Sequence, residues 1–480
     1  MSVQYRFSQE FIRNHFPDAE SLCTTRRQFL ARFGLGVGAL GLATMVAEDL
    51  ILPGAAAAPG EGNPLSARQP HFPARARHVV HIFAQGAPSQ VDTWDPKPEL
   101  SKRDGKAIPG VNGLAYGSPF KFKRCGKSGI EVSEVFNRLG EQVDDMAIIR
   151  SMYTDIPAHD VATVFMNTGS LRLARPSLGS WVLYGLGSEN QNMPGFISLR
   201  PGNAPPGGPS NWQSAFLPGV FQGTSINTKN PSVEQMIENI RNPFLGPREQ
   251  RHQLDLVHKL SALHSQNLQK DEQLEARIEA YEMAYKMQME ATDAFNLEKE
   301  PAHIRELYGN SAQGRQMLIA RRLIERGVRF VQVWAGGWDH HNDIEDRLPR
   351  SAAEIDQPLA AFLKDLKDHG LFDSTLVVWG GEFGRKPTRD RNGFENPGRD
   401  HNNKAFTTWL AGAGVKGGTV YGATDEFGGS AVQDKVHVHD LHATILHLLG
   451  FNHEKLTYRY NGRDFRLTDV YGNVVKGILS

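Results

Sequence analysis

The sequence predicts an α/β fold, in which helices cover both faces of a mostly parallel sheet. In the second half of the chain, short apolar runs with the length of buried strands alternate with longer runs of helix-forming residues. Glycine follows the helical runs at positions 327, 370 and 450, where it suits the end of a helix. The first apolar run, at 78–83, likewise ends in a turn sequence, Gln85-Gly86-Ala87-Pro88.

This pattern places the individual elements along the chain. We expect strands at 78–83, 147–151, 328–335, 376–379 and 406–410. We expect helices at 160–167, 177–186, 313–326, 354–369 and 438–449. Residues 202–223 are rich in Gly, Pro and Asn, and they predict a long irregular loop between elements.

One segment departs from the alternation. Residues 247–305 are almost all helix formers, and leucines at 256, 260, 263 and 268 follow a helical repeat. We expect two or three helices there, inserted as an excursion outside the sheet. Residues 59–480 are therefore predicted to form one α/β domain that carries this helical excursion.

The N-terminus has the order of a signal peptide. Thr25-Arg26-Arg27-Gln28-Phe29-Leu30 is a twin-arginine box, an apolar stretch follows at 33–47, and small residues at 55–58 suit a peptidase. The apolar stretch is shorter than the ~20 residues of a membrane span. We expect residues 1–58 to address the protein to the twin-arginine export machinery, so that it works in the periplasm or outside the cell. The alternative is an amphipathic N-terminal helix.

Composition excludes two classes of protein. The 53 basic and 53 acidic residues balance, which gives no electrostatic support for nucleic-acid binding. Only two cysteines occur, and Cys23 lies within the expected signal, so Cys125 stands alone in the mature chain. A disulfide framework is thus excluded. The 18 histidines are plentiful, and many lie beside Asp, Glu or Gly in the second half.

Potential metal ligands follow three predicted strands, and two more, Asp400 and His401, come just before the strand expected at 406–410. In open α/β sheets, ligands bind at the carboxyl ends of the strands, so these loops are where chemistry is expected. The candidate metal ligands in them are Asp92, Asp339, His341, Glu382, Asp400 and His401. Asp, Glu and His together suit Zn or Mn, whereas carboxylates alone suit Mg or Ca. The alternative is that they only cap helices or satisfy loop backbone, and the order of strands in the sheet decides between the two.

Two arginines lie in the same loops. The guanidinium groups of Arg385 and Arg399 have the geometry to hold a phosphate or sulfate. They could equally pair with Glu382 and Asp400, and the sequence leaves the two interpretations open. We assign the histidines of the last predicted helix, at 437, 439, 442 and 447, to structural roles.

Several segments resemble known families. Thr375–Arg385, Phe165–Gly169 and Val438–Gly450 resemble segments of alkaline phosphatases and sulfatases. From about residue 71 to the C-terminus, the chain more closely resembles an exported family known as domain of unknown function 1501. The motifs that carry this resemblance are Gly86–Pro98, Gly336–His341, Gly381–Arg385 and Gly398–His401. The resemblance implies an alkaline-phosphatase-like three-layer sandwich with a mostly parallel central sheet.

The resemblance also implies roles for single residues. Asp339 and His401 match a metal-ligand Asp and a metal-ligand His of the superfamily, and Glu382 stands where it has another ligand Asp. Gln85 stands where the first-strand Asp is expected, so Asp92 is the candidate to replace it. His159, ten residues before the glycine of the Thr-Gly pair, stands at the position of the nucleophile. It is therefore a candidate catalytic residue, as a nucleophile or a metal ligand, or else the site is inactive.

The function expected from these residues and this resemblance is hydrolysis of a phosphate, phosphonate or sulfate ester, with attack by metal-bound water. The metal would be a divalent ion such as Zn, Mn, Mg or Ca. The substrate would be a small anionic ester or a surface glycan. Two alternatives are a non-catalytic binding protein that keeps the fold, and a transferase that moves phosphorylated groups onto surface glycans.

Overall fold

The computed structural model describes residues 63–109, 111–171, 174–236, 246–267, 285, 293–390 and 396–480. The chain divides into two compact units, one of residues 1–51 and 238–285 and the other of residues 52–237 and 286–480. The described part of the first unit is residues 246–267 and 285, and its helix α8 spans Pro247–Asn267. The expected signal peptide, residues 1–58, lies outside the described residues.

A nine-stranded sheet forms the centre of the second unit, in the order β12-β4-β11-β8-β1-β7-β5-β6, with β15 pairing to β4. Its strands are β1 (His78–Ala84), β4 (Met146–Tyr153), β5 (Phe196–Arg200), β6 (Thr224–Asn227), β7 (Phe330–Ala335), β8 (Thr375–Gly380), β11 (Phe406–Ala411), β12 (Thr419–Tyr421) and β15 (Val436–His437). Every residue of β1, β7 and β8 is buried, because helices cover both faces of the sheet.

The sheet is mostly parallel, as the sequence predicts. β1 pairs in parallel with both β7 and β8, and β5 pairs in parallel with β6 and β7. Only β11 runs against its neighbours, β4 and β8. As a result, β4 points the same way as β1, β7 and β8, and the loops that follow these four strands leave from one edge of the sheet.

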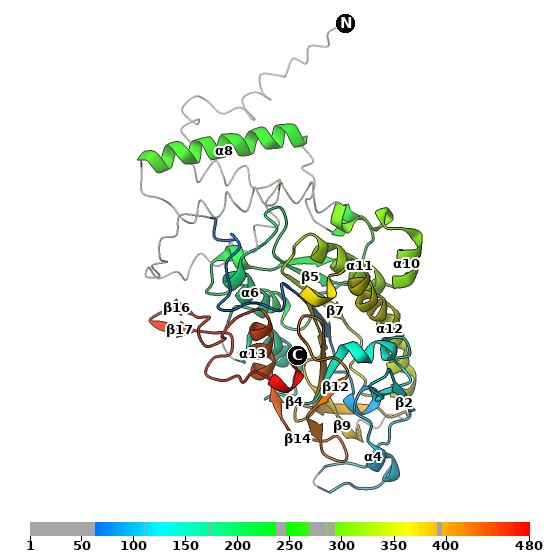
Figure 1. Cartoon of the computed structure of the whole chain (residues 1–480). Helices are drawn as coiled ribbons and strands as arrows, with labels where there is room; N and C mark the ends of the chain where they lie inside the picture. The colour runs from blue at the N-terminus through cyan, green and yellow to red at the C-terminus, as the bar shows by residue number, and fades with distance from the viewer. Residues whose placement is uncertain are drawn as a thin grey trace, which may run out of the picture. The chain divides into compact units, whose positions relative to one another are not determined.

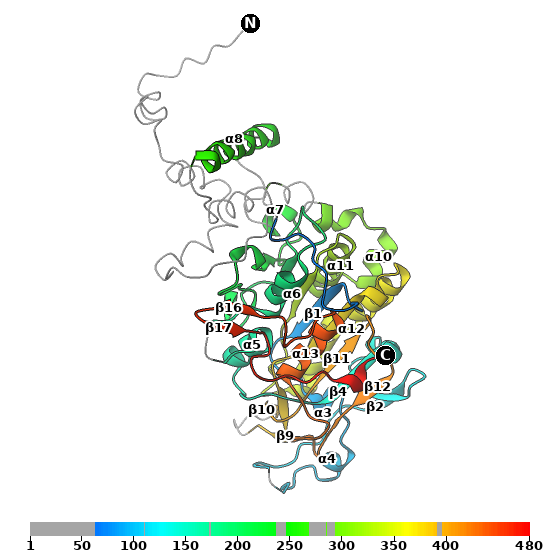
Figure 2. The ribbon, with the colours of Figure 1, turned by 60° about the vertical axis from the view of Figure 1, so that its left-hand side comes forward.

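Helices form a layer on each side of this sheet, which makes a three-layer sandwich (Figures 1 and 2). One layer contains α5 (His159–Thr168), α6 (Leu178–Leu186) and α13 (Val438–Leu448). The other contains α10 (Ala302–Tyr308), α11 (Ala312–Glu325) and α12 (Ile344–Asp368). The mixed α/β class predicted from the sequence is therefore confirmed.

Smaller elements decorate the second unit. The short helices are α3 (Gln90–Thr93), α4 (Pro98–Lys102) and α7 (Val233–Met236). Four two-stranded sheets pair β2 (Phe122–Cys125) with β3 (Ile130–Ser133), β9 (Gly384–Arg389) with β10 (Arg399–Asn402), β13 (Ala423–Thr424) with β14 (Ala431–Gln433), and β16 (Tyr458–Tyr460) with β17 (Arg463–Phe465). The β9–β10 pair matters most here, because it follows β8 directly and extends the carboxyl edge of the sheet.

The main differences from the predicted elements concern α12 and the strands β5 and β6. The helix expected at 354–369 begins ten residues earlier, at Ile344, because its buried apolar stripe (Leu348, Ala352, Ile355, Leu359) runs on through Pro349. The strands β5 and β6 were not predicted, because both are short and each borders the Gly- and Pro-rich loop at 202–223. Of the helical excursion expected at 247–305, α8 and α10 lie among the described residues.

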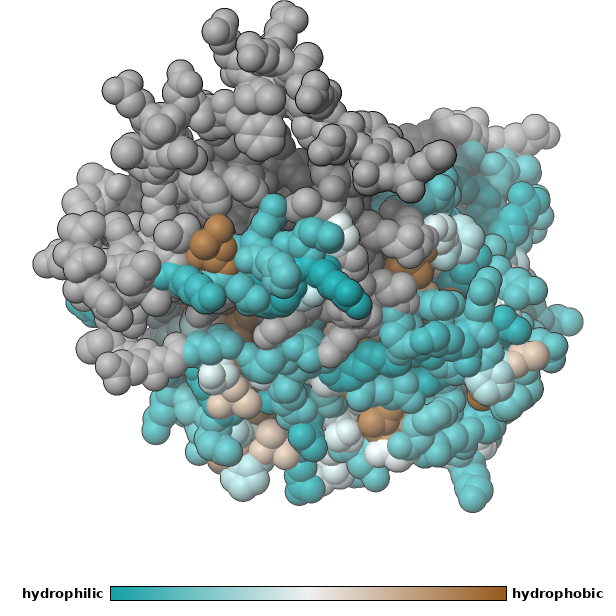
Figure 3. Space-filling view, turned by 90° about the horizontal axis from the view of Figure 1, so that it is seen from above, coloured by the Kyte–Doolittle hydropathy of each residue, from teal (hydrophilic) through white to brown (hydrophobic). Residues whose placement is uncertain are grey.

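Among the residues that the structure describes, no helix is both long enough and apolar enough to cross a membrane. The face drawn in Figure 3 is mainly hydrophilic where residues are described, with small, separate apolar patches. Cys125 is buried, and it forms no disulfide with any of the described residues.

Candidate metal centre

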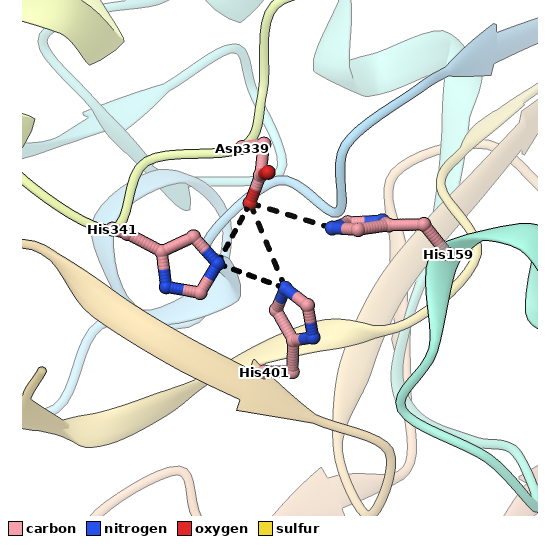
Figure 4. Close-up of side chains that lie close together, drawn as sticks. All are labelled: His159, Asp339, His341 and His401. Carbon is pink, nitrogen blue, oxygen red and sulfur yellow. Dashed lines mark hydrogen bonds and ion pairs between the residues drawn. The ribbon is translucent and has the colours of Figure 1, made fainter. Parts of the chain in front are cut away.

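Four side chains from three segments of the chain meet at the carboxyl edge of the sheet (Figure 4). His159 is the first residue of α5, in the segment that follows β4. Asp339 and His341 belong to the loop after β7, and His401 lies on β10. The strand order thus brings together residues that are far apart in the sequence, as the strand-end rule predicts.

The three imidazoles face one carboxylate oxygen. The Nε2 atoms of His341, His159 and His401 lie 3.1, 3.4 and 3.6 Å from Asp339 Oδ1. The Nε2 atoms of His341 and His401 are 3.0 Å apart. In a four-donor cage with metal–ligand bonds of ~2.0–2.1 Å, the donors are roughly 3.3 Å from one another. The distances to Asp339 therefore fit a single metal ion.

The other nitrogen of each imidazole is held by a hydrogen-bond acceptor. His159 Nδ1 lies 2.5 Å from Glu382 Oε1, and His401 Nδ1 lies 2.9 Å from the Pro157 carbonyl oxygen. His341 Nδ1 pairs with the Asp390 carboxylate. An acceptor at Nδ1 fixes the proton there and leaves Nε2 as the lone-pair donor, which is how metal-binding histidines are oriented in proteins.

Asp339 is held ionised. Burial alone would raise the pKa of its carboxyl group, but the nearby imidazoles of His159 and His401 and the charge of Arg385 hold the pKa far below its usual value. Arg385 reaches Asp339 Oδ1 at 2.5 Å and also donates to the carbonyl oxygens of Gly86, Ala87 and Arg399. Arg385 is itself almost fully buried, so it positions Asp339 instead of facing a substrate.

The imidazole of His159 is protonated on both nitrogens at neutral pH when no metal is present. Burial alone would lower the pKa of its imidazole, but the carboxylates of Asp339 and Glu382 raise it to about 9. Its Nε2 atom is buried and lacks a hydrogen-bond partner, and Asp339 Oδ1 at 3.4 Å is its nearby charged group. A buried nitrogen without a hydrogen bond is expensive, and a metal ion in the cluster would satisfy it.

Asp400 belongs to a second group with metal-ligand spacing, together with His341 and Asp390. Lys386 Nζ lies 2.5 Å from Asp400 Oδ2. Burial would raise the pKa of the Asp400 carboxyl group, but the contact with Lys386 and the hydrogen bond from the His401 N–H lower that pKa. His341 is the residue that the two groups share. Asp400 is therefore adjacent to the four-residue cluster but does not belong to it.

Asp92 and Arg399 form a separate ion pair. The guanidinium of Arg399 holds both oxygens of Asp92, at 2.6 and 2.9 Å, and neither side chain is exposed. The Tyr116 ring lies 4.8 Å from the Arg399 guanidinium. The predicted roles of Asp92 as a metal ligand and Arg399 as an anion-binding residue do not fit this placement, because each neutralises the other below the surface.

Glu382 also lies outside the four-residue cluster. It is fully buried, accepts from the Gly86 N–H at 3.0 Å, and contacts His159. Its position in the sequence matched a ligand Asp, but its contacts make it the hydrogen-bond partner of His159. Asp390 and Pro157, which accept from the Nδ1 atoms of His341 and His401, were not predicted from the sequence. For Asp390, the available signal was a charged residue directly after β9.

The sandwich and the cluster define the class: an α/β protein with a candidate metal centre at the carboxyl edge of its sheet. The chain matches the family model described as "Protein of unknown function (DUF1501)" over residues 76–479, and it belongs to that family. This confirms the family resemblance of the motifs. No curated protein matches the chain.

Solved structures similar to the chain include three from bacteria. The lipoteichoic acid synthase LtaP from Listeria monocytogenes is 9% identical, with 84% of this chain and 78% of that chain covered and a TM-score of 0.35. The sulfatase PsFucS1 from Pseudoalteromonas sp. is 12% identical, with 79% of this chain and 69% of that chain covered and a TM-score of 0.35. The C-terminal periplasmic domain of EcEptC from Escherichia coli, in complex with Zn, is 9% identical, with 80% of this chain and 84% of that chain covered and a TM-score of 0.33. At such identities and scores, the function of this chain has to be inferred from its own site.

Proposed function

We propose that this chain is an exported, metal-dependent hydrolase of a phosphate or sulfate ester. The observation that carries the proposal is the convergence of three Nε2 atoms on Asp339 Oδ1, with an acceptor at each Nδ1. Residues that only cap helices or satisfy loop backbone do not require three Nε2 atoms directed at one carboxylate oxygen. The donor set of three imidazoles and one carboxylate favours Zn²⁺ or another first-row transition metal over Mg²⁺ and Ca²⁺, which prefer oxygen ligands.

The residues of the site have distinct tasks. His159, Asp339, His341 and His401 would hold the ion, which would polarise an ester oxygen and lower the pKa of water at the site. Glu382 keeps the Nδ1 proton of His159 in place, and Arg385 fixes the carboxylate of Asp339. The α5 N-terminus adds backbone N–H groups for an anion, since its N-cap Ala158 has no side chain to accept from them.

Access to the site supports catalysis. The Asp339 side chain is 47% exposed, whereas those of the three histidines are 21–26% exposed, so the cluster opens to solvent on the Asp339 side. With His159 among the donors, the position of a covalent nucleophile is occupied by a ligand. We therefore infer direct attack by water without a covalent intermediate on the protein.

The test is a measurement of metal content and turnover. Full-length protein exported by its own signal should carry about one transition-metal ion per chain, because the two groups with metal-ligand spacing share His341 and one of them supplies four donors. His159→Ala, His341→Ala and His401→Ala should each lose the metal. The exposed His303 contacts nothing in the cluster, so His303→Ala is the matched control and should keep it. Equal metal content in all four variants would remove the basis of the proposal.

Turnover separates the catalytic proposal from its alternative. Four protein donors can fill a tetrahedral site completely, which is typical of structural metals, so a metal-stabilised binding protein is the second candidate. p-Nitrophenyl phosphate, bis-p-nitrophenyl phosphate and p-nitrophenyl sulfate should distinguish monoesterase, diesterase and sulfatase activity. Metal-dependent hydrolysis of one of them supports the enzyme. Full metal occupancy and metal-dependent thermal stability with no turnover of any ester would instead support the binding protein.

Export belongs to the same proposal. The twin-arginine box at Arg26 and Arg27 would direct the folded protein out of the cytoplasm, where an ester or surface glycan is available. The double variant Arg26→Lys, Arg27→Lys should remain in the cytoplasmic fraction. Normal export of that variant would contradict the route.

A further inference from the structure

A second cavity, outside the candidate metal centre, lies between the end of β4 and the start of α13. It has a volume of about 370 Å³, and its lining includes Tyr153, His437, Asp440, Glu454 and Tyr471. β15 brings His437 beside Tyr153, since these two residues are partners in the parallel β4–β15 ladder. A cavity of this size falls within the range of pockets that hold small ligands.

The lining of this pocket is acidic and lacks a lysine or arginine. Asp440 accepts hydrogen bonds from the backbone N–H groups of His437 and Asn473, at 2.8 and 2.7 Å, which carry no charge. Within the described residues, no ion pair involves Asp440. Glu454 has one cationic neighbour, Arg466, at 3.6 Å. The carboxylate of Asp440, which also accepts from the side-chain amide of Asn473 and caps α13, thus has no cationic side chain as a partner within the described residues.

Aromatic rings complete the pocket. Tyr471 is 62% exposed, although large apolar rings normally avoid solvent, and its ring stacks on His439 with the centroids 5.3 Å apart. The ring of Tyr153 lies 5.0 Å from that of His437. Aromatic faces beside carboxylates attract organic cations, because the negative face of the ring adds to the charge of the carboxylate.

The pocket and the metal centre share one segment of chain. Asp155, which pairs with His437 at 3.1 Å, is two residues after Tyr153, and Pro157 and His159 of the metal centre follow directly. Both sites therefore lie at the carboxyl edge of the sheet. Six residues span at most ~20 Å, so one substrate could reach both sites.

We propose that this pocket binds an organic ammonium group, with Asp440 as the counter-charge and Tyr471 as the aromatic face. Together with the proposed hydrolase function, on which this step rests, the pocket implies a substrate ester that carries an amine as well as a phosphate or sulfate. The binding itself requires neither a metal nor turnover.

The test uses choline and its neutral isostere 3,3-dimethylbutan-1-ol, titrated into the metal-free full chain by calorimetry or ligand-observed NMR. Choline should bind, and the isostere should bind at least roughly tenfold more weakly, since only the charge differs. Asp440→Asn and Tyr471→Ala should each weaken choline binding by roughly tenfold or more. Glu426→Gln, which changes an exposed carboxylate outside the pocket, is the control and should bind as the wild type does.

Three outcomes would overturn the proposal: equal binding of choline and its isostere, binding of glucose but not of choline, and choline binding that survives both variants. Because Asp440 also accepts from the first turn of α13, Tyr471→Ala provides a variant with little structural role. The titration is done without metal, so a failed hydrolase assay with intact choline binding rejects only the proposed function. Absent choline binding with an active hydrolase rejects only the pocket.

Discussion

Glu382 shows how one buried carboxylate can control a neighbouring ligand. It fixes His159 Nδ1 and, with Asp339, raises the pKa of that imidazole to about 9, although burial opposes the shift. Before a metal can bind at Nε2, His159 must lose its proton. The same contact that orients the ring would therefore make binding of the proposed metal release a proton and weaken as the pH falls.

Glu382→Gln should lower metal affinity by ~10–100-fold, the range found when outer-shell partners of metal ligands are changed. Glutamine has the same size and can still accept from the Gly86 N–H, so the fold should persist. The measurement is competition for the metal with a chromogenic chelator at fixed pH, with Glu426→Gln as the control. Unchanged affinity would show that Glu382 does not act through His159.

Asp92 and Arg399 form a buried ion pair that stabilises the fold, so substitution of Asp92 should lower stability without changing metal binding. Asp92→Asn leaves the fully buried Arg399 guanidinium without its counter-charge, which should lower the free energy of unfolding by ~3–5 kcal/mol. Metal content of the folded protein should not change. Urea unfolding followed by metal analysis at low temperature checks both parts, and loss of metal without loss of stability would return Asp92 to the ligand set.

At the scale of elements, α5 carries His159 at its first turn and ends at Gly169. This glycine has φ of +65°, and an added Cβ would lie 2.3 Å from the Leu467 carbonyl oxygen. Gly462 also has a positive φ, +80°, but nothing lies within 4 Å of its Cβ position. Substituting alanine at Gly462 therefore adds backbone strain alone, whereas substituting alanine at Gly169 adds both backbone strain and a steric clash.

Gly462→Ala should cost about 1 kcal/mol of unfolding free energy, from the left-handed backbone alone. Gly169→Ala should cost more, and because relief of the clash displaces α5, it should also weaken metal binding. Thermal unfolding and the chelator competition measure the two effects. Equal behaviour of the two variants would mean that the end of α5 does not help to place His159.

For the molecule as a whole, the buried histidines predict acid sensitivity. Burial lowers the pKa of His81 to about 4 and, together with the nearby charge of His439, that of His442 to about 3. The unfolded chain, with a histidine pKa near 6.5, binds these protons first, so folded-state stability is complete above pH 6.5 and is lost as the pH falls towards 4 and 3. His81 alone contributes a loss on the order of 3 kcal/mol.

His442→Gln should flatten the fall in urea midpoint between pH 6.5 and 4, because glutamine cannot take up the proton and keeps an N–H donor for the Met166 carbonyl. His303→Gln, an exposed change, should keep the wild-type slope. A slope that is the same in all three proteins would assign the acid sensitivity to carboxylates instead.

The sequence predicted the sheet and most of the cluster for the same physical reason. Apolar strands are recognisable, and the residues that follow parallel strands meet at one edge, which placed Asp339 and His341 there. His401 comes before β11, and it reaches the same edge because β11 is antiparallel to its neighbours, which the sequence did not predict. The pairing of Arg399 with Asp92 depends on which side chains share a buried space, and spacing along the chain does not contain that information. Likewise, Glu382 looked like a ligand because its burial behind His159 is a tertiary property.

The origin of the four donors also sets the order of events in biogenesis. Pro157 and His401 are 244 residues apart in the sequence, and the cage forms only when the strands between them have paired. A nascent chain therefore offers isolated histidines but no complete cage, so the proposed ion would enter only after folding is nearly finished. Occupancy would then report that a molecule has matured correctly, which would matter for the export of a folded protein proposed above.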